Sequence, residues 1–180
     1  MKKLVLAGFG GQGVLSLGQF LVSSGLNEGK EVSYLPAYGP EMRGGTANCS
    51  VIISEKVIAS PLCTIPDILV AMNTPSLIKF AKNVKSGGII IVNSSLIETP
   101  VERDDVTVYL IPANDLAQLA GTPKAANMVM AGAVVAASDV VSEKSIFDCI
   151  QDKFGHKASL VEINEKAYKA GYDAVKNYIK

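Results

Sequence analysis

The stretch Lys3-Leu4-Val5-Leu6-Ala7-Gly8-Phe9-Gly10-Gly11-Gln12-Gly13 begins with a short apolar run that stops at a cluster of glycines. Such a run is typical of a buried parallel strand that enters a tight turn. From Val14 onward, apolar residues recur at Leu17, Leu21 and Leu26, close to the spacing of one helical face. The stretch therefore predicts a strand, a glycine turn and a helix, which together form the first unit of an α/β fold.

Strands and helices are expected to alternate along the rest of the sequence. Apolar or alternating runs predict strands over 32–38, 47–54, 68–72, 89–92 and 106–111. Helical patterns cover 74–83, 113–120, 125–138, 143–153 and 162–178. This order predicts a three-layer α/β fold, with a mostly parallel, Rossmann-like sheet and helices on both faces. We also expect one short antiparallel hairpin, in which Glu55-Lys56 turns the strand 47–54 back onto Val57–Ala59, and a single domain over residues 1–180.

The composition of the 180-residue chain argues against several classes of function. Apolar residues make up 48%, and 17 basic side chains balance 17 acidic ones. This balance does not favour binding to nucleic acid or to an anionic membrane, and it predicts a chain that associates with other subunits. The longest apolar run, 128–137, is too short to cross a bilayer, and glycines interrupt the only candidate signal peptide. We expect a cytoplasmic protein.

Few side chains in the sequence suit catalysis or metal binding. His156 is the only histidine, and Cys49, Cys63 and Cys149 form no Cys-x-x-Cys pair. This set argues against a histidine metal site, a catalytic triad and an iron–sulfur cluster held by this chain alone. Scattered cysteines in odd number predict free, buried thiols rather than disulfides. We therefore predict no catalytic residue and no metal site in this chain.

The glycine motif has the G-x-G-x-x-G pattern between a strand and a helix, which is the context of a dinucleotide site. Such a site also needs an acidic residue at the end of the second strand to hold the ribose. Here Glu31 precedes that strand and Glu41 lies beyond it, so NAD or FAD binding is disfavoured. Two other interpretations stay open: a turn that packs the helix on the sheet, and a helix N-terminus that meets an anion or a partner.

A second motif follows the second strand, and it reads Tyr38-Gly39-Pro40-Glu41-Met42-Arg43-Gly44-Gly45. Pro40 and the two final glycines predict a shaped loop that holds Glu41 and Arg43. Arg43 could grip a carboxylate or a phosphate with two parallel hydrogen bonds, or could pair with Glu41 and fasten the loop. Both alternatives stay open.

Several polar or small residues follow predicted strands at the edge where α/β proteins bind ligands. They are Gly8, Tyr38, Asn73, Asn93 and Pro112. Asn at such a position is equally expected to cap a turn. We expect Thr74 to be the N-cap and Pro75 the first residue of a helix that continues to about Asn83. Asn127 opens the most apolar predicted helix, where it is either an N-cap or part of an interface.

Taken together, the two motifs resemble the gamma subunit family of 2-oxoacid:ferredoxin oxidoreductases. The strand Ala47–Ser54 and the segments Pro66–Asn73 and Asn127–Ala133 also look like the family, and the resemblance extends from about residue 4 to 175. The second motif carries Arg43-Gly44-Gly45 rather than Arg-Arg-Gly-Ala, which is more similar to the 2-oxoglutarate or 2-oxoisovalerate type than to the pyruvate type.

This resemblance implies a role inside a larger enzyme that decarboxylates a 2-oxoacid, forms an acyl-CoA and reduces ferredoxin. It implies that thiamine diphosphate, magnesium and iron–sulfur clusters are held by partner subunits, for which alpha, beta and delta subunits are the candidates. It also implies that this chain scaffolds the complex and contacts CoA or other subunits. The sequence agrees, since it has no Gly-Asp-Gly segment of the kind that holds magnesium and diphosphate.

The candidate contact residues come from both motifs and from the two asparagines. They are Gly8, Gly10, Gly11, Gln12, Gly13, Tyr38, Gly39, Glu41, Arg43, Gly44, Gly45, Asn73 and Asn127. In isolation the chain could form a homodimer. Two alternatives remain: an indolepyruvate oxidoreductase beta subunit, which shares the glycine motif, and a free-standing NAD(P)-binding protein.

Overall fold

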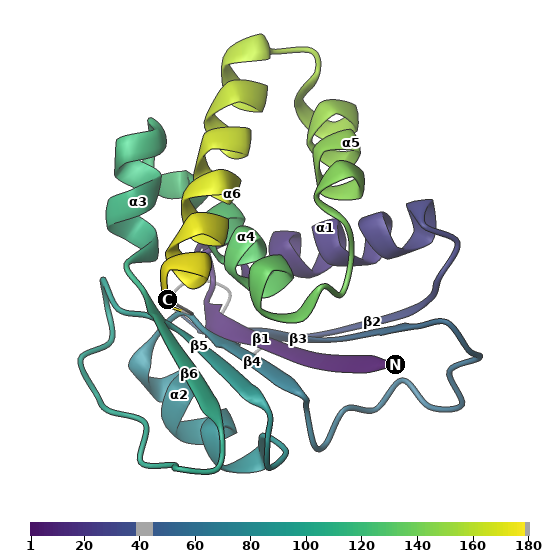
Figure 1. The fold of residues 1–180 in the computed structure, drawn as a ribbon, viewed down its shortest axis with the longest axis vertical. Coiled ribbons are helices and arrows are strands. Elements are labelled where there is room, and N and C mark those ends of the chain that lie inside the picture. Colours follow the sequence, from purple (N-terminus) through teal and green to yellow (C-terminus); the bar gives the residue numbers. More distant parts are fainter. Residues whose placement is uncertain (39–44, 179–180) are drawn as a thin grey trace.

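A computed structural model describes residues 1–38 and 45–178, and these form one six-stranded sheet with helices on both faces (Figure 1). The strand order across the sheet is β2-β3-β1-β4-β5-β6. The strands are β1 (Lys2–Phe9), β2 (Glu31–Tyr38), β3 (Thr46–Ser54), β4 (Ile68–Ala71), β5 (Ile89–Asn93) and β6 (Thr107–Ile111). The helices are α1 (Val14–Asn27), α2 (Thr74–Phe80), α3 (Ala113–Ala120), α4 (Ala126–Ser138), α5 (Glu143–Phe154) and α6 (Ala158–Tyr178), with short 3₁₀ turns at Ala81–Asn83 and Pro123–Ala125.

The sheet is mostly parallel, as predicted, and β3 alone runs against the other strands. Strands β1, β4, β5 and β6 pair in parallel, whereas β3 pairs antiparallel with β1 on one side and with β2 on the other. The predicted hairpin at Glu55-Lys56 is wrong, because Val57–Ala59 forms no strand. Strands β1 and β2 already pair with the two edges of β3, so residues 57–59 have no edge of β3 to pair with. The antiparallel hairpin of this structure is formed by β2 and β3 instead.

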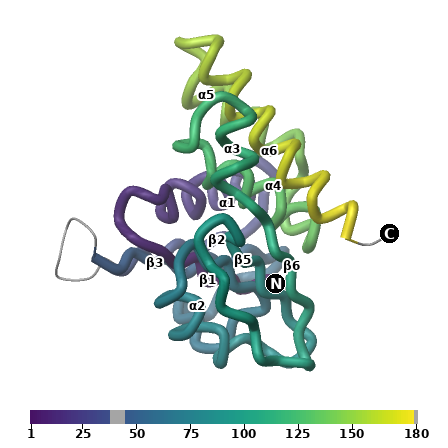
Figure 2. Tube along the Cα trace, turned by 90° about the vertical axis from the view of Figure 1, so that its left-hand side faces the viewer, coloured from purple at the N-terminus to yellow at the C-terminus, as the bar shows by residue number. Residues whose placement is uncertain are grey.

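The two faces of the sheet are covered unequally. Helices α1, α3, α4, α5 and α6 lie on one face, and α2 lies on the other beneath β4–β6 (Figure 1). Figure 2, turned by 90°, separates the two layers on either side of the strands. The main core packs on the first face and includes Leu4, Leu6, Leu17 and Ile91, while Val5 belongs to the smaller core under α2.

Helix α4 is the centre of the larger layer. Its residues from Ala126 to Ala136 are all buried, as expected for a helix that is apolar all round. It crosses α6 at two glycines: a Cβ added at Gly132 would lie 1.9 Å from the carbonyl oxygen of Tyr168, and one at Gly171 would lie 1.8 Å from that of Val129. The two backbones are therefore in direct contact. Helix α6 also begins at Ala158, one turn earlier than predicted.

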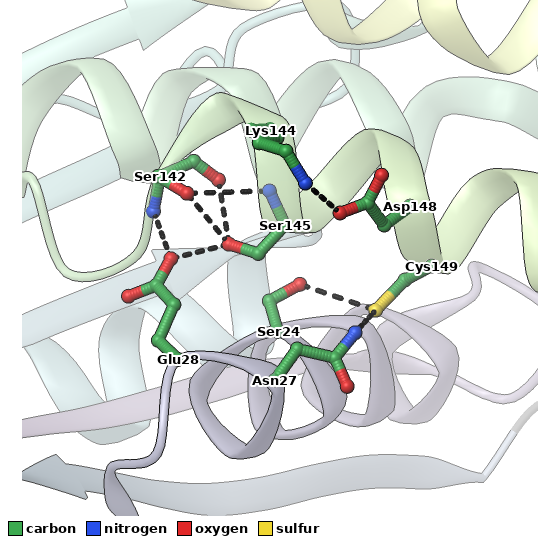
Figure 3. A network of polar contacts seen from close by, with 8 residues as sticks. All are labelled: Ser24, Asn27, Glu28, Ser142, Lys144, Ser145, Asp148 and Cys149. Carbon is green, nitrogen blue, oxygen red and sulfur yellow. Dashed lines mark hydrogen bonds and ion pairs between the residues drawn. The ribbon is translucent and has the colours of Figure 1, made fainter.

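The end of α1 is joined to the start of α5 by the polar network of Figure 3. Glu28 accepts hydrogen bonds from the backbone N–H of Ser142 (2.6 Å) and from the Ser145 hydroxyl, and its carboxylate lies 2.7 Å from the Lys30 ammonium. Burial raises the pKa of Glu28, but the hydrogen bonds from Lys30, Ser145 and Ser142 outweigh burial and lower the pKa from 4.5 to about 2. The charged form of Glu28 thus holds α1 against the N-terminus of α5.

Candidate functional site

The glycine turn follows β1 and leads into α1. The N–H of Gly10 donates to the Gly45 carbonyl (3.0 Å), which ties the turn to the start of β3. Gly11 and Gly13 have φ values of +94° and +74°, a region that favours glycine. Gly13 is the N-cap of α1 and provides no capping side chain. The first turn of α1 therefore has N–H groups available to an outside acceptor.

Gln12 fastens this turn to the end of β4. Its side-chain oxygen accepts from the Phe9 N–H (2.7 Å), and its amide nitrogen donates to the Met72 carbonyl (3.0 Å). A Cβ at Gly8 would lie 2.6 Å from the Gln12 side-chain oxygen, so glycine at this position makes room for Gln12. Gly8 and Gln12 are thus part of the packing of the turn.

Asn73 and Asn93 lie at the ends of β4 and β5, as predicted, and both side chains act in turns. The Asn73 side chain accepts from the Ser76 N–H (2.9 Å) and caps α2, so the prediction of Thr74 as the N-cap is wrong by one residue. Asn93 donates to Asn114 (2.8 Å) and accepts from the Ala113 N–H (3.2 Å), which joins β5 to α3. Pro112 is the N-cap residue of α3.

Asn127 has a different environment. It is not the N-cap, since α4 begins after Ala125, which has no capping side chain. A Cβ at Gly13 would lie 2.8 Å from the Asn127 Cγ, so the amide rests directly against the N-cap of α1. The residue is only 9% exposed, and within residues 1–38 and 45–178 its side chain has no hydrogen-bond partner. The Asn127 amide atoms are not fully enclosed, since the Tyr168 hydroxyl is the only fully buried unpaired side-chain atom among the described residues. The amide next to the N-cap of α1 is therefore able to bond a group that enters from outside.

Two clefts flank the first turn of α1 and share Ser16. The first, of about 420 Å³, lies between the glycine turn and the start of β3. The second, of about 400 Å³, lies between α1, the 3₁₀ turn before α4, and the α5–α6 junction. Its lining includes the residues Phe20, Thr122, Lys124, Asn127, Lys153 and Phe154.

The second cleft is electropositive. Neither Lys124 nor Lys153 has an acidic partner in the part of the chain that the structure describes. The Lys153 ammonium lies 4.8 Å from the ring centre of Phe20 and 5.9 Å from that of Phe154. The N-termini of α1 and α4 add the positive ends of their helix dipoles. The arrangement of ammonium groups, amide, hydroxyl and aromatic rings suits a phosphorylated ligand with a flat ring.

Sequence reasoning missed this cleft. Lys124 and Lys153 belong to no motif and are separated by 29 positions, and no local pattern marks either residue. Of the residues that line this cleft, only Asn127 was a candidate from the sequence, where it was predicted to be an N-cap or part of an interface.

The second motif is described only at its two ends. Tyr38 is the last residue of β2, and the Gly45 carbonyl accepts the hydrogen bond from Gly10. Gly39, Glu41, Arg43 and Gly44 lie outside the described residues, so the predicted alternatives for Glu41 and Arg43 stay predictions. The contact between Gly10 and Gly45 brings the two motifs together at the same edge.

The three cysteines are free, as predicted, but only Cys49 and Cys149 are buried, whereas Cys63 is half-buried. Burial raises the pKa of the Cys49 thiol to about 12, and burial also raises that of Cys149, whose sulfur accepts from Ser24 and Asn27 at 3.5 Å (Figure 3). Among the residues that the structure describes, no group of three or more His, Cys, Asp or Glu side chains could hold a metal ion. Over the same residues, no helix is both long and apolar enough to cross a membrane.

Comparison with known proteins places this chain in a family. The model of the pyruvate ferredoxin/flavodoxin oxidoreductase family matches residues 3–174. A ketoisovalerate oxidoreductase subunit VorA from Methanothermobacter marburgensis is 40% identical over 95% of this chain, which spans 36% of that relative. A 2-oxoglutarate synthase subunit KorC from Methanocaldococcus jannaschii is 35% identical, with 97% of this chain and 94% of the relative covered. The chain therefore spans about a third of the VorA relative and nearly all of the KorC relative.

Solved structures agree in fold. The gamma subunit of a keto/oxoacid ferredoxin oxidoreductase from Geobacter sulfurreducens has a TM-score of 0.84 at 27% identity, with 98% of this chain and 99% of that chain covered. A 2-oxoglutarate:ferredoxin oxidoreductase from Magnetococcus marinus, with 2-oxoglutarate, coenzyme A and succinyl-CoA bound, has a TM-score of 0.90 at 26% identity over 98% of this chain and 32% of that chain. The resemblance found in the two glycine motifs is confirmed, and the chain belongs to the pyruvate ferredoxin/flavodoxin oxidoreductase family.

Proposed function

We propose that this chain is the gamma-type subunit of a cytoplasmic, multi-subunit 2-oxoacid:ferredoxin oxidoreductase. The enzyme oxidatively decarboxylates 2-oxoglutarate or a branched-chain 2-oxoacid, forms the acyl-CoA and reduces ferredoxin. The observation that carries this proposal is the match of almost the whole chain to relatives named as subunits of ketoisovalerate and 2-oxoglutarate oxidoreductases.

Within that enzyme, the chain acts as a scaffold and the cofactors sit on alpha and beta subunits, with a delta subunit as a further possible carrier of clusters. Among the described residues, no three His, Cys, Asp or Glu side chains come together, so these residues do not fit an iron–sulfur cluster. The sequence also has no Gly-Asp-Gly segment for magnesium and diphosphate. At the sheet edge, Gln12, Asn73 and Asn93 are already engaged in structural hydrogen bonds. We therefore derive no chemical step on this chain.

Its direct contribution is to hold the nucleotide end of CoA. Asn127 supports this role, because a buried amide without a partner at a helix N-terminus can donate to a phosphate oxygen. Lys124 and Lys153 supply the positive charge that the phosphate groups of CoA require. Phe154, which is half-buried, supplies an aromatic face beside the adenine base. Phe20 is only 4% exposed and its ring faces the Lys153 ammonium, so it supports Lys153 instead. The glycine turn on the other side of Ser16 takes the diphosphate, with Arg43 as a further anion ligand.

A purification and an assay test the subunit role. The chain, tagged in its own cells, should bring down alpha and beta subunits together with thiamine diphosphate and iron–sulfur colour. The purified complex should oxidise 2-oxoglutarate or 2-oxoisovalerate in a CoA-dependent way when tested on a panel of 2-oxoacids. Recovery of the chain alone would contradict the proposal, and activity confined to indolepyruvate would favour the indolepyruvate oxidoreductase alternative.

The CoA contact has its own test in the complex. Lys124→Ala and Lys153→Ala should each raise the KM for CoA about three- to tenfold, because each removes a charge-assisted contact to phosphate. The KM for the 2-oxoacid should stay unchanged. Lys144→Ala is the matched control, since Lys144 lies on the same helix as Lys153 and is 85% exposed in a pair with Asp148. Unchanged CoA kinetics in both cleft variants and in Arg43→Ala would remove this role.

A second candidate is a free-standing NAD(P)-binding protein, which the G-x-G-x-x-G turn before α1 favours. Isothermal titration of the isolated chain with NAD(P)H separates the two candidates. Tight binding would favour the second candidate, and its absence together with co-purified subunits would favour the first.

A further inference from the structure

The connection between β3 and β4 exposes aliphatic side chains to an unusual degree. Residues 57–66 contain no charged side chain and form no helix or strand. Val57, Leu62 and Ile65 are 81%, 62% and 61% exposed. A single exposed aliphatic residue on a protein surface is ordinary, whereas three in one uncharged segment indicate a surface that another molecule covers.

The sheet beside this connection has no helix over it. In β2, Leu35 and Ala37 are exposed and share their face of the sheet with Ser50 and Asn48, their register partners in β3. Among the described residues, the core under α2 includes no side chain of β2 or β3. In Figure 1, α2 lies beneath β4–β6, and only the connection from β3 passes beneath the other half of the sheet. We name this surface, Leu35, Ala37, Asn48, Ser50 and residues 57–66, the open sheet face.

A polar cleft of about 440 Å³ lies within the open sheet face. It is lined by Asn48 and Ser50 of β3, by Cys63 and Thr64 of the connection, and by Asn83 near α2. In the portion of the chain that is described, the side chains of Asn48, Ser50 and Asn83 make no hydrogen bond. These amides and hydroxyls offer donors and acceptors to an approaching chain without requiring a charge on it.

The open sheet face is therefore neutral, aliphatic and equipped with free amide and hydroxyl groups. Surfaces that are permanently covered by another subunit have this character, because charged side chains are costly to bury there. Lys3 and Asp67 lie at the border of the open sheet face, close enough to act on Cys63 with opposite effects, so the border has no excess of positive charge. A nucleic acid or an anionic ligand would need such an excess.

The relatives indicate which molecule covers it. This domain makes up 94% of the KorC relative but only 36% of the VorA relative and 32% of the Magnetococcus chain. The same domain thus occurs both as a nearly whole chain and as one part of a longer one. In a chain of the KorC kind, where the domain stands alone, a non-covalent contact has to hold the domain to its neighbour.

We propose that the open sheet face docks the subunit that corresponds to the remainder of the VorA-type chain. This inference rests on the proposed function, since it takes the chain to be a subunit of that enzyme. The partner covers the connection 57–66 with a neutral aliphatic surface and pairs its own main-chain groups with Asn48 and Ser50.

The experiment uses the complex purified from the native cells through a tag on this chain. Leu62→Lys places a charge in the centre of the open sheet face and should lower the recovery of the partner subunit about tenfold or more. Leu119→Lys is the matched control, because Leu119 is 84% exposed on α3, on the opposite side of the sheet, and this variant should assemble normally. Both isolated variants should unfold like the wild-type chain, since neither side chain is buried.

Hydrogen exchange gives an independent measurement. Amides of residues 57–66 should exchange about tenfold more slowly in the wild-type complex than in the isolated chain. Three results would overturn the proposed docking site: normal assembly of Leu62→Lys, an equal loss of the partner subunit in Leu62→Lys and Leu119→Lys, or unchanged amide exchange of residues 57–66. The isolated chain could instead prove to be a dimer that Leu62→Lys converts to a monomer. That result would overturn the proposal and would show that a second copy of this chain covers the open sheet face. If the wild-type chain brings down no other subunit, the proposed function fails instead.

Discussion

The two faces of this sheet differ in what they do for the protein. The face under α1 and α3–α6 is closed, with a continuous core and two helices whose backbones touch at Gly132 and Gly171. The face under α2 is closed only over β4–β6 and leaves an aliphatic surface beside β2 and β3. We infer that the first face supplies most of the stability of the chain, and we propose that the second supplies a surface for association.

The largest expected effect is at the contact between α4 and α6. Gly171→Val should destabilise the chain by about 4 kcal/mol or more, because the new side chain would meet the Val129 carbonyl. Urea unfolding followed by circular dichroism measures this loss. Asp173→Ala, exposed on the same helix, serves as the control and should change stability by less than about 0.5 kcal/mol. A small effect of Gly171→Val would show that the helices can separate without cost.

The two cores can be compared directly by the same substitution in each. Leu17 and Leu77 are 0% and 2% exposed, and they belong to the larger and the smaller core. Leu17→Ala should cost about 3 to 4 kcal/mol and Leu77→Ala about 2 kcal/mol, because the thinner layer under α2 can relax into the cavity. Equal losses in urea unfolding would contradict the difference that we draw between the faces.

A smaller, pH-dependent effect is expected at the network of Glu28, which lies in the closed layer. The pKa of Glu28 is lowered from 4.5 to about 2 in the folded chain, so its charged form stabilises the fold above the unfolded pKa. This contribution, about 1 to 3 kcal/mol, should be present at pH 6 and decline as the pH falls from about 4.5 toward 2. Glu28→Gln should remove it, so the stabilities of variant and wild type should converge at low pH. A difference that does not depend on pH would exclude this origin.

The smallest effect is expected on the open sheet face. Val57→Ser should change the stability of the isolated chain by less than about 0.5 kcal/mol, because Val57 is 81% exposed. Thermal unfolding of the isolated chain measures this change. A loss above about 1 kcal/mol would show that the connection 57–66 packs within the chain, and would weaken the case for a partner.

Much of the fold was predictable because its signals are local. The period of two in 47–54 and the apolar runs at 68–72 and 89–92 gave strands close to β3, β4 and β5. The glycines before Val14 marked a turn whose positive φ values at Gly11 and Gly13 are now evident. One error was local, with the cap of α2 displaced by one residue from Thr74 to Asn73. The hairpin expected at Glu55-Lys56 failed for a long-range reason, because β1 and β2 occupy both edges of β3.

The candidate site was predictable only in part. Gly8, Gln12 and Asn73 were placed correctly at the edge of the sheet, but they serve its packing. Gly8 leaves room for Gln12, the Gln12 side chain fastens the turn, and the Asn73 side chain caps α2. Lys124 and Lys153 were missed, because nothing in the sequence relates a 3₁₀ turn before α4 to the end of α5.

The sequence by itself determined the alternation of strands and helices, the glycine turn and the family, since each depends on residues that are neighbours in the chain. Only the tertiary structure decided that β3 lies between β2 and β1, that Asn127 rests against Gly13, and that half of one sheet face has no helix over it. The physical reason is that hydrophobic periodicity reports only which side of each element is buried. Pairing and packing between distant segments depend on which surfaces are complementary in the folded chain.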